Sequence, residues 1–165
     1  MSQAGISTRR RPIFELAAKL VKLGGVRYSH EKAFNKAAED MAQKIRASCS
    51  IADQVTETLA ALPQPARLLL VADQFEELFT LTPPADQKPF VEALLAAAHL
   101  AELKVLATLR ADFYGQAISL TPELSQWLQD GLVNHRPLQR ADWEAVILQP
   151  AKTVGLQVDP ALVTL

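Results

Sequence analysis

The sequence predicts an α/β fold in which helices flank a mainly parallel sheet. Two short apolar runs, 67–72 and 104–109, have the length of buried strands rather than of helices. Helix-like patterns precede, separate and follow these runs, and that alternation favours a parallel sheet. The C-terminal part of the chain is predicted to be helical.

The first third of the chain is predicted to form three helices. Pro12 suits a first helical position, and apolar residues follow it at helical spacing until Gly24 and Gly25 end the helix. Ser29 can cap a second helix and Ser50 a third, since a serine side chain accepts a hydrogen bond from a free N–H group of the first turn. We therefore expect the strands to begin only after about residue 66.

The strand at 67–72 leads directly into a cluster of carboxylates. Asp73 follows it at once, and Glu76 and Glu77 come three and four residues later. Open α/β sheets bind their ligands at the edge formed by the carboxyl ends of the strands. An Asp at this edge suits a Mg²⁺ ion that holds a nucleotide phosphate. The alternative is an amphipathic helix cap or a solvated loop.

The strand at 104–109 also ends in charged residues, Arg110 and Asp112. In a parallel sheet both strand ends lie at the same edge, so Arg110 can converge with Asp73 although the two are far apart in the sequence. An acid for a metal ion and a cation for phosphate charge are what phosphoryl transfer requires. The alternative role for Arg110 is a structural salt bridge to Asp112 or Glu76.

The rest of the second half is predicted from its caps. Asp86 can cap a helix before the second strand, and Thr121 can cap another helix after it. Leu132 and Val133 are a candidate short third strand.

A last long helix is predicted from about Arg140 towards Gly155, with a kink at Pro150. Asp159 and Pro160 open one more helix. We expect three apolar side chains of the long helix to be buried: Trp143, Val146 and Ile147.

The composition argues against several other kinds of protein. A formal net charge of -1 does not suit a general nucleic-acid binder. Cys49 is the only cysteine, and the three histidines have no metal-ligand spacing with it or with each other. No run reaches the roughly 20 apolar residues of a membrane span, and the first residues lack the apolar core of a signal peptide. We expect a cytoplasmic protein that binds neither membranes nor nucleic acids.

Three segments of the chain form a recognisable set: LLLVADQFEELFTL, KVLATLRADFY and NHRPLQRADWEAVILQPAKTVGLQVDPALV. In this order they resemble the novel STAND NTPase domain, a branch of the P-loop ATPases and GTPases. The resemblance runs from about Arg11 to Leu165, and DQFEELF is its most specific part. It implies a P-loop NTPase-like fold, Mg²⁺ and ATP or GTP as cofactors, and a role in signalling. Protein partners would bind through regions outside this chain, such as WD or other repeats.

The resemblance also implies roles for individual residues. Asp73 would be the Walker B residue that binds Mg²⁺, directly or through water. Glu76 or Glu77 would orient or activate the attacking water, and Arg110 would be the sensor residue on the neighbouring strand. Gln74 stands where a general AAA+ ATPase has its catalytic Glu, so which of the two Glu residues acts is open.

The P-loop itself is missing from this sequence. No G-x-x-x-x-G-K-[ST] run occurs, although its N–H groups and Lys are what hold the phosphates in such enzymes. In the family this motif precedes the segment that matches Pro12 onward, so the chain resembles the interior of a larger NTPase, cut at both ends. We expect it to bind nucleotide poorly and to be inactive alone, and whether it is an enzyme by itself stays open.

The predicted organisation has three parts. Residues 1–11 are expected to be a disordered basic tail, 12–138 a partial P-loop NTPase α/β core, and 139–165 the start of a truncated helical lid or C-terminal subdomain. The resemblance places the missing P-loop strand beside the strand that bears Arg110, which leaves an unpaired edge for self-association. The rival hypothesis is a non-enzymatic module that binds a partner through its helices and this sheet edge.

Overall fold

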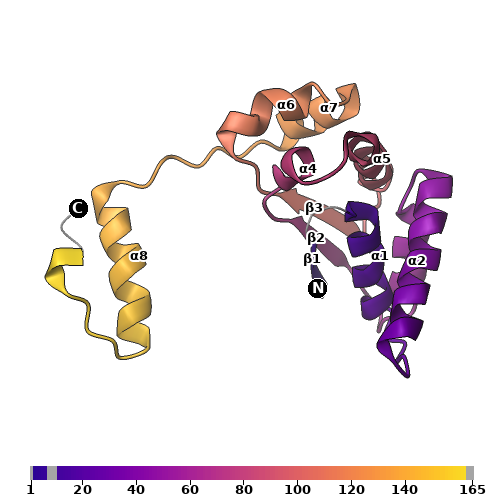
Figure 1. Cartoon of the computed structure of the whole chain (residues 1–165), viewed down its shortest axis with the longest axis horizontal. Coiled ribbons are helices and arrows are strands. Elements are labelled where there is room, and N and C mark those ends of the chain that lie inside the picture. The colour runs from indigo at the N-terminus through magenta and orange to yellow at the C-terminus, as the bar shows by residue number, and fades with distance from the viewer. Residues whose placement is uncertain (1, 7–10, 163–165) are drawn as a thin grey trace. The chain divides into compact units, whose positions relative to one another are not determined.

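The computed structural model describes residues 2–6 and 11–162, and the chain divides into two units, residues 1–130 and 131–165 (Figure 1). The first unit contains a sheet with helices packed against it, and the second unit contains one long helix. Within the described residues, no helix combines the length and the apolar character that crossing a membrane requires.

The sheet has three parallel strands in the order β1-β2-β3. They are β1 (Ser2–Ile6), β2 (Leu68–Ala72) and β3 (Leu103–Ala107). The central strand β2 pairs in register with β3, Leu68 opposite Leu103 and Ala72 opposite Ala107, so both strands end at the same level. The predicted α/β class with a parallel sheet is confirmed, and both strands lie where the apolar runs predict them.

Strand β1 differs from the sequence expectation, which places a disordered tail at 1–11. Residues 2–6 pair with β2 along its whole length, and Ile6 lies opposite Ala72. The run SQAGI contains only one β-branched residue, so its own preference for a strand is weak, and pairing with β2 supplies the stabilisation. Residues 1 and 7–10 of the expected tail lie outside the described residues.

Three helices precede β2, as predicted: α1 (Pro12–Leu23), α2 (Glu31–Ser48) and α3 (Ala52–Ala60). Helix α1 packs against α2, α3 and β1, and Figure 1 shows α1 and α2 side by side. The five α1 residues predicted at helical spacing are buried: Ile13, Leu16, Ala17, Leu20 and Val21.

The caps of the next two helices differ in part from the expectation. At the start of α2, Nδ1 of His30 accepts the hydrogen bond from the Ala33 N–H, in place of the predicted Ser29. At the start of α3, Oγ of Ser50 accepts from the Ala52 N–H at 3.1 Å, as the sequence suggests.

Five helical segments follow β2 in the first unit. Two of them were predicted, α5 (Pro84–Leu95) and α7 (Pro122–Gly131), and Oγ1 of Thr121 caps α7 through the Leu124 N–H. Helix α5 begins at Pro84, earlier than the predicted cap Asp86. The other three are too short to show an apolar period in the sequence: α4 (Glu77–Thr80), a 3₁₀ turn at Ala111–Phe113 and α6 (Tyr114–Ile118).

Burial alternates along the strands, so the expectation of strands buried on both faces is wrong. On one face the side chains belong to the hydrophobic core. On the other face Leu69 and Val71 are only half-buried, Lys104 is exposed, and Leu106 is 53% exposed. Parallel sheets are usually covered on both faces, so this face of the first unit is unusually open. The core face carries Leu68, Leu70, Ala72 and Leu103.

The second unit contains α8 (Arg140–Thr153) and a 3₁₀ turn at Pro160–Leu162. The predicted strand at Leu132 and Val133 is wrong, because both residues lie in an irregular exposed segment. The predicted burial of Trp143 and Val146 is also wrong, since they are 54% and 55% exposed. An apolar stripe shows which face of a helix can be buried, but it does not supply the surface that buries it.

Two charged contacts organise the start of α8. The Asp142 carboxylate accepts a hydrogen bond from the Gln139 N–H at 2.9 Å, and the Gln139 side chain completes a capping box. The Arg136 guanidinium donates two further bonds to the same carboxylate, at 2.7 and 3.2 Å. The backbone bond from Gln139, followed by the Arg136 contact, holds the pKa of Asp142 below its ordinary value.

Candidate functional site

Asp73 lies at the carboxyl end of β2, the central strand of the sheet, and its side chain is exposed. Its Oδ1 atom accepts two hydrogen bonds. The Thr108 hydroxyl donates one at 2.6 Å, and the Gln74 N–H donates the other at 3.1 Å. One oxygen of this carboxylate therefore has two donors, whereas no donor from the described residues reaches Oδ2.

Thr108 reaches Asp73 because β2 and β3 end level. Ala72 lies opposite Ala107, so Asp73 and Thr108 are the next residues on neighbouring strands. The backbone continues the pairing past both ends. The Thr108 N–H donates to the Ala72 carbonyl at 3.0 Å, and the Phe75 N–H donates to the Thr108 carbonyl at 2.8 Å. The two strand exits are therefore joined by backbone bonds as well as by the side-chain bond.

Gln74 forms a turn after β2 that points its N–H group towards Asp73 and Thr108. Its φ angle is 54°, in the left-handed region that L residues other than glycine seldom occupy. In this conformation its N–H donates both to Asp73 Oδ1 and to Thr108 Oγ1, the second bond at 2.9 Å. The next residue, Phe75, is 1% exposed and packs its ring edge-on to Phe79. Burial of the Phe75 side chain fixes the backbone immediately after Gln74 and so stabilises the turn.

Glu76 and Glu77 follow this turn at the start of the short helix α4, and both are half-buried. The Glu76 carbonyl accepts the N–H groups of Phe79 and Thr80 at 3.0 and 3.2 Å, so its backbone closes the first helical turn. Glu76 and Glu77 therefore belong to the start of the helix that follows the turn, three and four residues after Asp73. The choice between them as the acting group stays a prediction.

Arg110 is two residues beyond Thr108 and forms an ion pair with Asp112. Its Nε and Nη2 atoms donate to the two Asp112 oxygens at 3.2 and 2.8 Å, and its guanidinium lies 5.8 Å from the centre of the Phe113 ring. Of the two salt-bridge partners that the sequence allows, the structure selects Asp112. No hydrogen bond or ion pair joins Arg110 to Asp73. Both side chains of the pair are more than half exposed, so the pair contributes little to stability.

The site suits a magnesium ion that is bound mainly by other groups. Within the described part of the chain, no three His, Cys, Asp or Glu side chains gather as a metal site. Mg²⁺ does not need such a cage, since it usually keeps several waters and takes one or two carboxylates together with substrate phosphates. Asp73, which is exposed and whose Oδ2 has no donor among the described residues, fits this pattern.

Thr108, whose hydroxyl donates to Asp73, is not among the site residues predicted from the sequence. A signal for it was present. The two strands are equally long, and each is followed at once by a polar residue, so in-register parallel pairing would place Asp73 beside Thr108. The exact ends of the strands were needed to see this, and the second run was predicted one residue late at its start and two residues late at its end.

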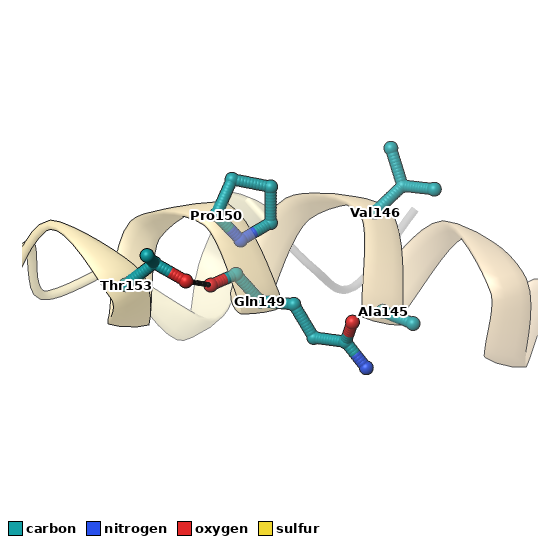
Figure 2. Close-up of a pocket in the computed structure, with 5 residues that line it drawn as sticks. All are labelled: Ala145, Val146, Gln149, Pro150 and Thr153. Atoms are coloured by element: carbon teal, nitrogen blue, oxygen red, sulfur yellow. Dashed lines mark hydrogen bonds between the residues drawn. The ribbon is translucent and has the colours of Figure 1, made fainter. Parts of the chain in front are cut away.

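A shallow pocket lies on α8, in the second unit. Figure 2 shows the five residues that line it, and the hydrogen bond from the Thr153 hydroxyl to the Gln149 carbonyl. None of the five side chains is ionisable, and all come from one helix. The pocket therefore carries no catalytic or metal-binding chemistry. Its lining is Ala145, Val146, Gln149, Pro150 and Thr153.

Comparisons with known proteins agree with the resemblance read from the sequence. The model of one protein family, described as novel STAND NTPase 1, matches residues 2–165. No curated protein and no solved structure gives a significant match. Because the family match spans nearly all of the sequence, including the strand exits at Asp73 and Thr108, the chain belongs to the novel STAND NTPase 1 family.

Proposed function

We propose that this chain supplies the metal-binding half of a nucleotide site in a STAND NTPase. Asp73 is the Walker B carboxylate, which holds Mg²⁺ directly or through water. Arg110 is the sensor cation on the neighbouring strand, and Glu76 or Glu77 orients the water. The ion, when bound, neutralises phosphate charge. The nucleotide is ATP or GTP, and its state acts as a signalling switch in the complete protein, whose partners bind elsewhere.

The observation that carries this proposal is the position and bonding of Asp73. The carboxylate stands at the carboxyl end of the central parallel strand, where open α/β sheets bind ligands. One of its oxygens is fixed by Thr108 and Gln74, and the other has no donor among the described residues. A carboxylate with one oxygen fixed in this way can bind a cation through its other oxygen without first losing rotational freedom. Arg110 would leave Asp112 to reach a phosphate, and their exposed ion pair is weak enough to allow it.

The phosphate cradle is assigned to residues outside this sequence, because no Walker A run occurs within it. We therefore expect the chain alone to bind nucleotide weakly and not to hydrolyse it. Titration with Mg-ATP tests this part: micromolar affinity together with turnover that is lost in Asp73→Ala would show that a P-loop is dispensable.

The metal-binding role is tested by Mn²⁺, which takes the same oxygen ligands as Mg²⁺ and broadens nearby NMR signals. In the ¹⁵N-labelled chain, Mn²⁺ should broaden the Gln74 and Phe75 amide signals first. Asp73→Asn should abolish this selectivity, whereas Asp86→Asn, which alters a half-buried acid on α5, should keep it. Equal broadening around several acidic residues in the wild type would refute the proposed role of Asp73.

A second candidate function is a protein-interaction module, and one observation favours it. Among the described residues β3 is an edge strand, and Leu106 in it is 53% exposed. An unpaired strand edge with an exposed apolar side chain favours pairing with another chain. The occupant that we propose is a second copy of this chain.

A further inference from the structure

We propose that Thr108 is a positioning residue for the metal ligand, and that it holds the Asp73 carboxylate in the orientation in which its other oxygen faces the cation. The inference rests on the proposed metal-binding role of Asp73 and extends it to a residue on another strand. It starts from the shortest side-chain hydrogen bond at the site, 2.6 Å from Thr108 Oγ1 to Asp73 Oδ1.

The donor and acceptor roles at this bond are fixed by chemistry. A hydroxyl has one hydrogen to donate, and the Thr108 hydroxyl donates its hydrogen bond to Oδ1. Its oxygen then accepts the Gln74 N–H at 2.9 Å, and the same N–H also reaches Oδ1 at 3.1 Å. Thr108, Gln74 and Asp73 thus form a closed three-membered network in which each bond supports the others.

This network makes the two carboxylate oxygens unequal. Oδ1 has two donors, whereas Oδ2 has none among the described residues. Without Thr108, only the Gln74 N–H would still hold this exposed side chain, so rotation about χ1 and χ2 would become easier and the carboxylate would lose its single orientation. Outer-shell hydrogen bonds of this kind orient metal ligands, and their loss typically weakens metal binding about 10- to 100-fold.

Thr108 is well placed for this role because its own backbone is fixed. Its N–H and its carbonyl both take part in bonds that prolong the β2–β3 pairing, to Ala72 and to Phe75. The hydroxyl therefore projects from a rigid part of the sheet rather than from a loop, which is the arrangement that holds a ligand accurately. Since Arg110 follows two residues later, the same strand exit carries both the sensor candidate and the residue that orients Asp73.

The test compares three variants by NMR. Thr108→Val keeps the side-chain shape but removes the donor, Thr108→Ser keeps the donor, and Thr80→Val makes the same change at a nearby hydroxyl that donates only to the Glu76 carbonyl. The first readout is the set of three-bond Hα–Hβ couplings of Asp73, which report its χ1 rotamer without any metal. The second is the Mn²⁺ concentration that half-broadens the Gln74 amide signal.

We expect one Asp73 rotamer in the wild type, in Thr108→Ser and in Thr80→Val, and averaged couplings in Thr108→Val. The half-broadening Mn²⁺ concentration should rise about 10-fold in Thr108→Val alone. Thr108→Ala provides the same comparison if the valine variant does not fold.

A single Asp73 rotamer and wild-type Mn²⁺ sensitivity in Thr108→Val would overturn the inference and leave the metal-binding role of Asp73 intact. If Mn²⁺ does not select Asp73 in the wild type, the proposed function fails and the metal-directed part of the inference fails with it. The rotamer couplings then still decide whether Thr108 fixes the side chain.

Discussion

Replacing Gln74 with glycine should stabilise the chain, although the residue lies at the proposed site. Gln74 has a φ angle of 54°, and a left-handed conformation costs an L residue roughly 1–2 kcal/mol. Glycine avoids this cost but loses more backbone entropy on folding, about 0.5–1 kcal/mol relative to alanine. The net expectation is that Gln74→Gly raises the free energy of unfolding by about 0.5–1 kcal/mol.

Cys49 provides a matched comparison outside the site. It has a φ angle of 51°, follows α2 as its C-cap and is exposed. Cys49→Gly should give a gain similar to that of Gln74→Gly. Valine at either position should lower the free energy of unfolding by about 1–2 kcal/mol, because a β-branched residue tolerates positive φ least.

Urea denaturation followed by circular dichroism measures all four variants. The glycine variant at position 74 keeps the backbone N–H that binds Asp73 and Thr108, so the Asp73 rotamer couplings should not change. Two results would contradict the expected cost of the positive φ angle at Gln74: Gln74→Gly destabilises the chain while Cys49→Gly stabilises it, or Gln74→Val has no effect. Either result would mean that the turn after β2 does not have a left-handed residue at position 74.

Three further predictions concern other parts of the chain. Gln54 is 5% exposed, and its Oε1 has no partner among the described residues. Gln54→Met should therefore raise the free energy of unfolding by about 1 kcal/mol. The control Gln87→Met removes the hydrogen bond to the Thr82 carbonyl and should lower the free energy of unfolding. Urea titrations of both variants decide this, and a loss at Gln54 would contradict it. Asp142 has a lowered pKa in the folded chain, so its contribution to the start of α8 is complete above about pH 4 and is lost as the pH falls below that value. Amide exchange at the start of α8 should show this loss in the wild type and not in Asp142→Asn, which already lacks the charge. For self-association through β3, Leu106→Lys should shift the mass measured by light scattering towards the monomer, whereas Leu132→Lys, outside the sheet, should not; an unchanged mass in both would count against the β3 edge.

Strands β2 and β3 and the long helices could be predicted because each carries a local signal. The run that becomes β2 is apolar over its whole length, and the run that becomes β3 is apolar except for Lys104. Helix α1 shows its buried stripe in the spacing from Ile13 to Val21. Elements that depend on distant partners could not be predicted in this way. Strand β1 gains its conformation by pairing with β2, and Trp143 is 54% exposed because an apolar side chain does not by itself determine which surface covers it.

The candidate site shows the same division. Asp73 and Arg110 could be identified because a charged residue directly after an apolar strand is visible in the sequence. The bond between Asp73 and Thr108 depends on strand register, which is a property of two segments 35 residues apart. The left-handed turn at Gln74 has no sequence signal at all, since glutamine is not a residue that prefers positive φ.

The most direct test of the central claim is to locate a cation in a crystal of the chain soaked with MnCl₂. The anomalous signal of manganese should appear at Asp73, either about 2.1 Å from Oδ2 or one bridging water further away, and should be absent from crystals of Asp73→Asn. Thr108 should still donate to Oδ1 in the metal-bound crystal. A manganese peak on Glu76 or Glu77 without Asp73, or no peak at the carboxyl end of β2, would contradict the assignment of Asp73 as the metal ligand.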